Sequence, residues 1–401
     1  ILMLGCFDTK GEDFDFLRKC IVEKGQHIIT MNTGVMETSV SFPIDIDAGV
    51  VARAAQNSLP ELRKTGDRGY SVEVMGRGAA AIIAGLIANK KIKGVIGMGG
   101  GAGTYIALTA MQEVPLGIPK LCLSTLATKD VSRQIGHKDV LLMPSIVDVA
   151  GLNSISRRLI RQAAAAICAM SDLQDVQDEK LNGTIAISMF GNTSHCVNQC
   201  SELLRKKGYE VMAFHANGIG GRNMEALIRE NCFDAVLDIT TTELADDLCG
   251  GICSAGSDRL TAAAEMNIPQ VVVPGCLDMV NFAHLDTVPG HYKNRTLYSW
   301  APDVTLMRTD KEENTILGGR LAEKVNRSTA PVCVLLPLRG ISQVDAEGGI
   351  FYEPGIDAAL FDAIRKNIKA PASCIEVDAH INDKKFSEKL VNTLLEILNN
   401  K

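Results

Sequence analysis

The segment VIGMGGGAGTYIAL contains the residues whose types and spacing most clearly predict chemistry. An apolar run typical of a buried strand leads into a glycine-rich loop from Gly97 to Thr104, and a helical pattern follows. A loop of this kind exposes backbone N–H groups at a helix N-terminus, where the helix dipole also favours an anion. The sequence therefore predicts a phosphate site here.

The same loop excludes two common nucleotide sites. It is not a Walker A loop, because the sequence contains no Gly-Lys dipeptide. Gly97, Gly99 and Ala102 match a dinucleotide fingerprint, but the next strand ends at Ser124 and Thr125 rather than at an acidic residue that would bind a ribose hydroxyl. NAD is thus disfavoured. The alternative interpretation is a glycine turn that only lets the helix pack closely on the strand.

Two more loops of the first half are predicted to follow strands, and ligands of doubly wound sheets bind outside the carboxyl ends of strands. In DTKG, Asp8, Thr9 and Lys10 are candidates because a lysine supplies a point charge to a phosphate. In STLAT, the hydroxyl groups of Ser124 and Thr125 could donate to phosphate oxygens. DTKG could equally be a solvated turn that caps the next helix.

In the second half, GIGGRNME places glycines and an arginine at a helix start. Gly220, Gly221 and Arg222 are therefore candidates for binding a phosphate or a carboxylate of a substrate.

Two further strand ends in the second half carry polar side chains. Thr240, Thr241 and Glu243 follow the strand AVLDI, where they could bind a substrate or cap the next helix. Asp278 and Asn281 follow the strand VVVP. Asp278 is the candidate catalytic residue, as a general base or as a magnesium ligand, and a helix N-cap is the alternative.

Both halves of the chain show the same order of elements. Residues 2–6 form an apolar run, DTKG a turn, 12–24 a helical pattern and 27–31 a second apolar run, and from Thr184 this order returns. We predict an α/β protein with two Rossmann-like, doubly wound lobes of mainly parallel strands and a cleft between the lobes. The polar segment 171–183 places the boundary near Gln177, which gives lobes 1–177 and 178–401.

The amino-acid composition disfavours several classes of protein. Of the 401 residues, 46% are hydrophobic and 22% are charged, as in globular domains. The net charge of −6 disfavours nonspecific nucleic-acid binding. No continuous apolar run approaches the ~18 residues of a membrane span. Several of the 12 cysteines, such as Cys122 and Cys333, lie in apolar runs, so we expect reduced thiols, a cytoplasmic location and no membrane association.

The motifs GVIGMGGGAGT, FHANGIGGRNMEALI, VLDITTTELAD and CLDMVNF together resemble an uncharacterised protein family related to the ATP-binding N-terminal domain of the tomato mosaic virus resistance protein. The resemblance covers the chain from LGCFDTKG to HINDKKF. It implies two Rossmann-like subdomains with the first strand traded between them, a homodimer, and ATP or ADP as the ligand. It also implies a phosphate cradle of Gly99, Gly100, Gly101, Ala102, Gly103 and Thr104.

One residue of this cradle departs from the family's pattern. Ala102 stands where the plant protein has glycine. Because alanine, unlike glycine, rarely adopts a left-handed backbone conformation, that conformation is disfavoured at this residue.

Two hypotheses about function follow. In the first, the chain is an enzyme that uses ATP, with magnesium as a further expected cofactor, on a small acidic or phosphorylated metabolite in the interlobe cleft. In the second, it is a nucleotide-responsive binding module without turnover. They share the site in the first lobe and differ in the role of Asp278.

Overall fold

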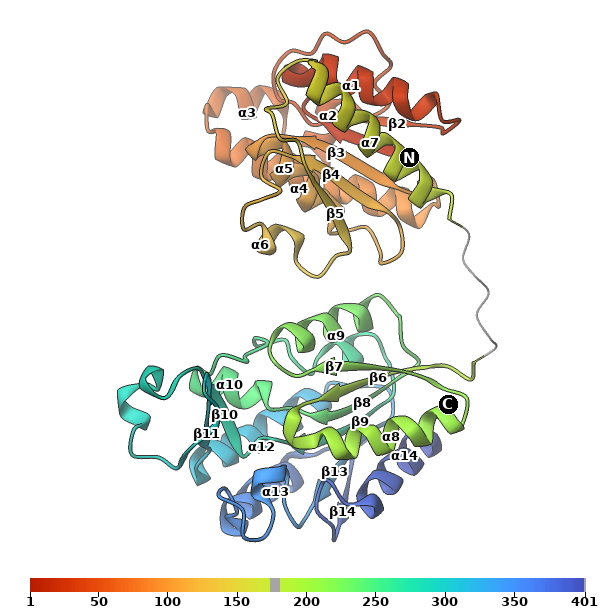
Figure 1. Cartoon of the computed structure of the whole chain (residues 1–401). Helices are drawn as coiled ribbons and strands as arrows, with labels where there is room; N and C mark the ends of the chain where they lie inside the picture. The colour runs from red at the N-terminus through yellow and green to blue at the C-terminus, as the bar shows by residue number, and fades with distance from the viewer. Residues whose placement is uncertain (174–180, 400–401) are drawn as a thin grey trace. The chain divides into compact units, whose positions relative to one another are not determined.

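Figure 1 shows the computed structural model of the chain, which describes residues 1–173 and 181–399. The chain divides into two compact units, Ile1–Gln177 and Asp178–Lys401. The predicted boundary near Gln177 lies outside the described residues. Each unit is built on its own parallel sheet with helices on both faces, so the predicted α/β class is confirmed.

The first unit is a doubly wound sheet with the strand order β2-β1-β3-β4-β5, and all four strand pairs are parallel. Chain order reverses between β1 and β3, and such a switch point is where open α/β sheets bind ligands. The elements are β1 (Leu2–Gly5), α1 (Phe7–Val22), β2 (Ile29–Asn32), α2 (Ala48–Ala54), α3 (Leu59–Thr65), α4 (Arg68–Ala88), β3 (Val95–Gly99), α5 (Gly101–Met111), β4 (Lys120–Ser124), α6 (Ser132–Ile135), β5 (Val140–Pro144) and α7 (Ser154–Ser171).

Alternation along the strands creates a core on each face of this sheet. Leu2 and Leu4 of β1 pack with α2, α4 and α5, whereas Met3 packs with α1 and α7 on the opposite face. Because β1 pairs with β2 and β3 of its own unit, the expectation of a first strand traded with the second lobe is wrong.

The start of α7 in this unit is explained by a neighbouring side chain. Asn153 precedes α7 and accepts hydrogen bonds from the N–H groups of Ile155 and Ser156, which is a standard N-cap. DTKG was expected to be a turn, but α1 begins at Phe7 and includes it as the first helical turn. Only Lys10 departs from helical geometry there, with φ −135°.

Helix α4 is the one described helix that is long and apolar enough to cross a membrane. Length and composition are weak support for a span, because a helix packed into a protein core has the same properties. Here Val74, Met75, Ala79 and Ile83 of α4 are buried in the core of the first unit.

The second unit repeats this topology with one more strand, in the order β7-β6-β8-β9-β13-β14. Its parallel sheet comprises β6 (Thr184–Met189), β7 (Glu210–His215), β8 (Ala235–Thr240), β9 (Gln270–Gly275), β13 (Val332–Pro337) and β14 (Ser373–Val377). Its helices are α8 (Ser194–Lys206), α9 (Ile219–Arg229), α10 (Glu243–Cys249), α11 (Ala262–Glu265), α12 (Lys311–Val325), α13 (Pro354–Asn367) and α14 (Lys384–Asn399).

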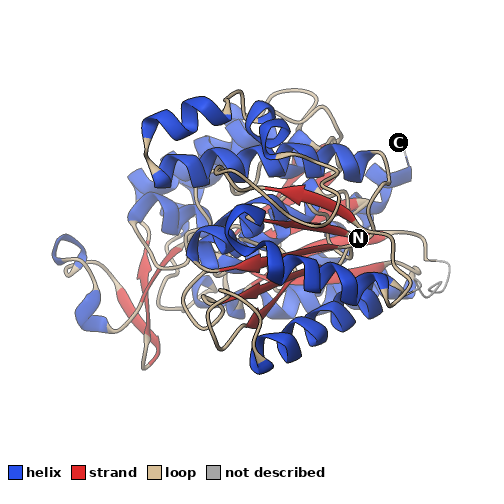
Figure 2. Ribbon diagram, turned by 90° about the horizontal axis from the view of Figure 1, so that it is seen from above, coloured by secondary structure: helices blue, strands red, loops and turns tan. Residues whose placement is uncertain are grey.

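A small antiparallel sheet, which the sequence did not reveal, is inserted into the second unit. It consists of β10 (Met279–Phe282), β12 (Val304–Arg308) and β11 (Leu297–Ala301), in that order. Figures 1 and 2 both show it at the edge of the second unit, beside the parallel sheet.

Candidate functional site

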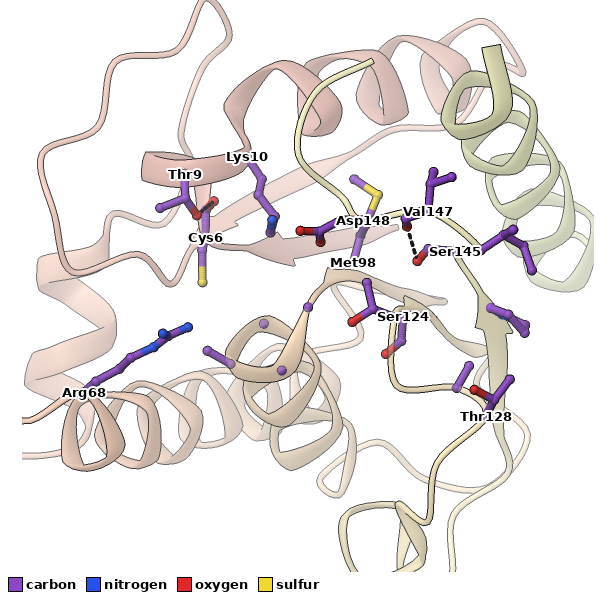
Figure 3. A pocket seen from close by; sticks show the side chains of 18 residues that line it. Cys6, Thr9, Lys10, Arg68, Met98, Ser124, Thr128, Ser145, Val147 and Asp148 are labelled. Atoms are coloured by element: carbon purple, nitrogen blue, oxygen red, sulfur yellow. Dashed lines mark hydrogen bonds between the residues drawn. The ribbon is translucent and has the colours of Figure 1, made fainter. Parts of the chain in front are cut away.

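A pocket of about 770 Å³ lies at the carboxyl edge of the first sheet, over the switch point between β1 and β3 (Figure 3). Loops that follow β1, β3, β4 and β5 surround it. The predicted residues that line this pocket are Thr9, Lys10, Gly100, Gly101, Ala102, Gly103, Ser124 and Thr125. The structure thus brings together three loops that the sequence analysis singled out separately.

Some glycines of the loop are explained by packing of α5 against β3. A Cβ atom on Gly97 would lie 2.6 Å from the Cβ of Ala107, and one on Gly99 would lie 3.0 Å from the Cα of Gly103. A side chain at either position would separate the helix from the strand. For these residues the packing interpretation holds.

Gly100 and Gly101 have no such explanation. A Cβ atom on Gly101 would have nothing within 4 Å, and the nearest atom to one on Gly100 would be Oγ1 of Thr125 at 3.7 Å. Neither glycine has a positive φ, the conformation for which glycine is preferred. Since neither packing nor backbone conformation requires glycine, the bare backbone leaves space for a ligand at the start of α5.

The N-terminus of α5 is open to that space. Gly100 is its N-cap and provides no side-chain cap, and the helix extends over 11 residues from Gly101. Ala102 is the second residue of the helix and does not have a positive φ. The alanine is therefore compatible with the loop, and no left-handed backbone is needed there.

Gly99 and Thr104 do not line the pocket but hold its floor in place. The Thr104 hydroxyl is 2.6 Å from Oγ of Ser124, and the N–H of Thr125 donates to the Gly99 carbonyl at 3.2 Å. Thr104 is only 1% exposed. These contacts fix the loop after β3 against the loop after β4.

Two cationic side chains reach the pocket from different elements. Figure 3 shows Lys10 extending from α1 and Arg68 from the start of α4. The Lys10 ammonium donates to the Val149 carbonyl. Arg68 is exposed, and its guanidinium makes no hydrogen bond or ion pair with the described residues. Asp148, after β5, supplies a carboxylate at the same pocket.

Asp8 does not line this pocket but lies in a neighbouring one of about 480 Å³. Its Oδ2 accepts a hydrogen bond from the N–H of Met36 at 3.0 Å, which fixes the loop after β2. The two pockets share Cys6, Thr9, Arg68 and Ala102. The neighbouring pocket also has apolar walls, which are formed by Val35, Leu62, Val72, Met75 and Ile106.

Several pocket residues were missed by sequence reasoning. Asp148 and Ser145 follow the apolar run of β5, so the rule that ligands bind at strand carboxyl ends could have found them. Arg68 gave no such signal, because it reaches the pocket only through the packing of α4 beside the sheet. The other missed residues are Cys6, Met98, Pro144, Ile146 and Val147, whereas Ala127 and Thr128 belong to the predicted STLAT loop.

The predicted anion site of the second unit is occupied by the chain itself. Glu243 Oε1 accepts hydrogen bonds from the N–H groups of Gly218 at 2.7 Å and Gly221 at 3.1 Å. An internal carboxylate therefore neutralises the start of α9, and the N–H of Gly220 donates to Asn217 Oδ1 at 3.1 Å. These contacts favour a structural role for Gly220 and Gly221 over the predicted binding of a substrate. Arg222 is exposed, and its Nη1 donates to the Ser254 carbonyl at 3.2 Å.

Glu243 belongs to a buried ion network rather than to a substrate site. Its Oε2 accepts from Nε of Arg259 at 2.5 Å, and Nη1 and Nη2 of Arg259 donate to the two carboxylate oxygens of Asp238 at 2.6 and 2.7 Å. Glu225 lies 3.3 Å from the same guanidinium. All four side chains are nearly inaccessible to solvent.

The remaining predicted substrate residues are also used internally. The Thr240 hydroxyl is 2.7 Å from that of Thr193, the Thr241 hydroxyl donates to the Val273 carbonyl at 3.1 Å, and Asn281 donates to Asp246 at 2.8 Å. None of them lines a described pocket.

Asp278, the predicted catalytic residue, is 0% exposed and lines none of the described pockets. Ser342 donates to its Oδ2 at 2.6 Å. Burial raises the pKa of Asp278 to about 6, against the attraction of Arg308. The inserted sheet accounts for this burial, because Arg308 of β12 pairs with Met279, the residue after Asp278. The geometry favours a structural role over proton transfer.

Asp246, on α10, makes the stability of the second unit depend on pH. Burial raises its pKa from 3.8 to about 7, although Asn281 donates to it. The unfolded chain therefore loses this proton first as the pH rises. Between about pH 4 and about pH 7, this residue lowers the free energy of unfolding by up to about 1.4 kcal/mol per pH unit. Outside this window we expect no further change of this contribution with pH: it is absent below about pH 4 and at its full value above about pH 7.

Urea unfolding of the wild type and of Asp246→Asn at about pH 5 and about pH 8 checks this expectation. The stability of the wild type relative to the variant should fall as the pH rises. Asp247→Asn, at the neighbouring exposed position, serves as the matched control and should show no such trend. A difference between wild type and Asp246→Asn that is the same at both pH values would contradict the prediction.

A known protein family matches both units of the chain. The N-terminal domain of the Uncharacterised protein family (UPF0261) matches residues 1–176, and its C-terminal domain matches residues 182–398. The chain belongs to the UPF0261 family. The resemblance found in the sequence is thereby confirmed at the level of the family.

Relatives of this UPF0261 chain occur in bacteria and plants. A UPF0261 protein of Clostridium tetani is 42% identical over 99% of this chain and 98% of its own length. The UPF0261 protein RA0729 of Rhizobium meliloti is 39% identical over 100% of this chain. The ToMV resistance protein Tm-1(GCR237) of Solanum lycopersicum is 34% identical over 99% of this chain, which spans 55% of the tomato protein.

Among solved structures, a putative UDP-N-acetylglucosamine 2-epimerase from Listeria monocytogenes is similar over 68% of the UPF0261 chain and 78% of its own, with a TM-score of 0.23 and 11% identity. This likeness supports no statement about function.

Proposed function

We propose that the first unit binds ATP or ADP, with the phosphates at the N-terminus of α5. The observation that carries this proposal is the pair Gly100 and Gly101, whose missing side chains neither packing nor φ explains. Backbone N–H groups at a helix N-terminus bind phosphate oxygens, and the helix dipole adds to the attraction.

The charges around the pocket support the same ligand. Lys10 and Arg68 approach from α1 and α4, so phosphates between them and α5 would have positive charge on more than one side. The volume of about 770 Å³ lies within the usual range of about 300–1,000 Å³ for small-molecule sites.

Magnesium would fit this arrangement only together with the nucleotide. The described residues contain no group of three or more His, Cys, Asp or Glu side chains that could hold a metal ion. Magnesium commonly binds through one or two carboxylates and substrate phosphates. Asp148 is the residue in position to do this, since its Oδ1 lies 4.0 Å from where a Cβ of Gly100 would be. Bound there, magnesium would neutralise phosphate charge.

The neighbouring pocket favours an enzyme over a binding module without turnover. It shares Cys6, Thr9, Arg68 and Ala102 with the nucleotide pocket, so a second molecule there would lie next to the phosphates. We propose a small acidic metabolite as that molecule, held by Arg68. This arrangement replaces the earlier assignment of the substrate to Asp278 and the second lobe. Release of ADP or phosphate that depends on an added carboxylic acid would support the enzyme, and its absence across a broad panel would favour the module.

Arg68→Ala is expected to weaken ADP binding by about 10-fold to about 100-fold, because hydrogen bonds to a charged group contribute about 1.5–3 kcal/mol. Isothermal titration calorimetry on the full chain measures this change. Arg77→Ala, on the same helix but paired with Glu73 at 3.5 Å, is the control and should leave the affinity unchanged. Equal ADP affinities in the two variants would rule out a phosphate contact by Arg68.

The family resemblance also implies a homodimer, which we propose for this chain. Sedimentation velocity at micromolar concentrations would test it, and a single species with the mass of one chain would overturn it.

A further inference from the structure

A second polar pocket, of about 500 Å³, lies entirely within the second unit. The segments that follow β6, β13 and β14 form it, including the first turns of α8, so it lies at the carboxyl edge of the second parallel sheet, where ligands of such folds bind. Its polar side chains are those of Asn192, His195, Asn198, Gln343, His380 and Asn382, together with Ser194. No function described above uses them.

The polar side chains that line this pocket include no acidic residue, lysine or arginine. They are amides, imidazoles and a hydroxyl. Amide groups both donate and accept hydrogen bonds, which suits a ligand with several hydroxyl groups. An anionic ligand would instead be expected to meet arginine or lysine, as in the pocket of the first unit.

Part of the wall is fixed in place. His380 Nε2 lies 2.9 Å from the Ser342 carbonyl, and Asn382 donates to the carbonyl of Asn192 at 3.0 Å. The side-chain amides of Asn198 and Gln343 are exposed and make no hydrogen bonds with the described residues. Two amides without hydrogen bonds to the described residues, one on α8 and one in the segment after β13, thus line a pocket whose remaining wall is held in place.

Asn192 provides an independent sign of a ligand. It is 1% exposed and lines the pocket, yet its Oδ1 has no hydrogen-bond partner among the residues that the structure describes. Its Nδ2 makes a weak contact to the sulfur of Met279, at 3.7 Å. Buried amides in native proteins are nearly always satisfied, so an unsatisfied one at a pocket wall calls for a partner that the chain does not supply.

An aromatic side chain borders the same pocket. Trp300, on β11, is the single tryptophan of the chain and is 39% exposed. Its Cζ2 would lie 3.6 Å from a Cβ on Gly191, a residue of the pocket lining. An exposed indole offers a flat apolar surface with a polar edge. A sugar has the matching shape, because its ring carries C–H groups on one face and hydroxyl groups around its edge.

We propose that this pocket binds an uncharged sugar ring, held through its hydroxyl groups by Asn192, Asn198 and Gln343 and bordered by Trp300. The proposal is independent of nucleotide binding in the first unit. It places a carbohydrate-recognition site on residues to which no function has been assigned.

Tryptophan fluorescence of the full chain tests this proposal, because Trp300 alone produces the signal. The probes are D-glucose, D-galactose, N-acetyl-D-glucosamine and D-ribose, and glycerol and inorganic phosphate are the comparison solutes. We expect a saturable change with at least one sugar. Asn198→Ala and Gln343→Ala should each weaken its binding by about five-fold, the usual effect of one hydrogen bond.

The two variants remove exposed side chains that make no hydrogen bonds within the described part of the chain, so the fold should be retained. Asn294→Ala, an exposed amide outside the pocket, is the matched control and should bind the sugar as the wild type does. The proposal is overturned if no sugar gives a saturable change, if phosphate saturates as readily as the sugars, or if Asn198→Ala and Gln343→Ala both keep full affinity.

Discussion

Arg259→Met is expected to lower the free energy of unfolding of the second unit by about 3–5 kcal/mol, because it leaves buried carboxylates without a counter-ion. Arg259 is 1% exposed and contacts Asp238, Glu243 and Glu225. Methionine preserves much of the side-chain volume but none of the charge. Urea-induced unfolding followed by circular dichroism measures the change.

The control for this prediction is Arg229→Met. Arg229 forms an ion pair with Glu265 at 2.7 Å, but the two side chains are 38% and 49% exposed. Exposed pairs contribute at most about 1 kcal/mol. If Arg259→Met costs no more than Arg229→Met, the buried network does not stabilise the fold as we infer.

Gly101→Val is expected to weaken ATP and ADP binding by about 2 kcal/mol or more, or about 30-fold, through the loss of charge-assisted contacts to the backbone. The added side chain would occupy the space in front of the first turn of α5. Because a Cβ at this position meets nothing within 4 Å, the fold itself should tolerate the change. Calorimetry gives the affinity, and thermal unfolding of the same sample reports on the fold.

Gly355→Val is the matched control for this variant. Gly355 also lies in the first turn of a helix, α13 in the second unit, and a Cβ there meets nothing within 4 Å. It should leave nucleotide affinity unchanged. If Gly101→Val binds ADP as tightly as Gly355→Val, the phosphates do not approach the start of α5.

Sequence reasoning found pocket residues where their position depends on local order. A buried strand, a glycine loop and a helix are contiguous in 94–111, so the place of Gly100 and Gly101 at a pocket was predictable without knowledge of tertiary contacts. Position at strand ends was equally informative for Lys10 and Thr125, because parallel strands bring their carboxyl ends to one edge.

Sequence reasoning failed where a side chain that is distant in the sequence determines what a loop can bind. The loop before α9 has the composition of an anion site, but Glu243 from α10 already fills it. Asp278 follows a strand as a catalytic carboxylate would, but the inserted strand β12 brings Arg308 beside it and excludes solvent. Neither contact leaves a periodic or local signal in the sequence.

The central claim is that nucleotide phosphates bind at the N-terminus of α5. A crystal structure of the full chain with ADP tests it most directly. We expect phosphate oxygens within about 3 Å of the backbone nitrogens of Gly101, Ala102 or Gly103, with Lys10 and Arg68 alongside. Phosphates bound elsewhere on the chain, or no ADP density at saturating concentration, would contradict it.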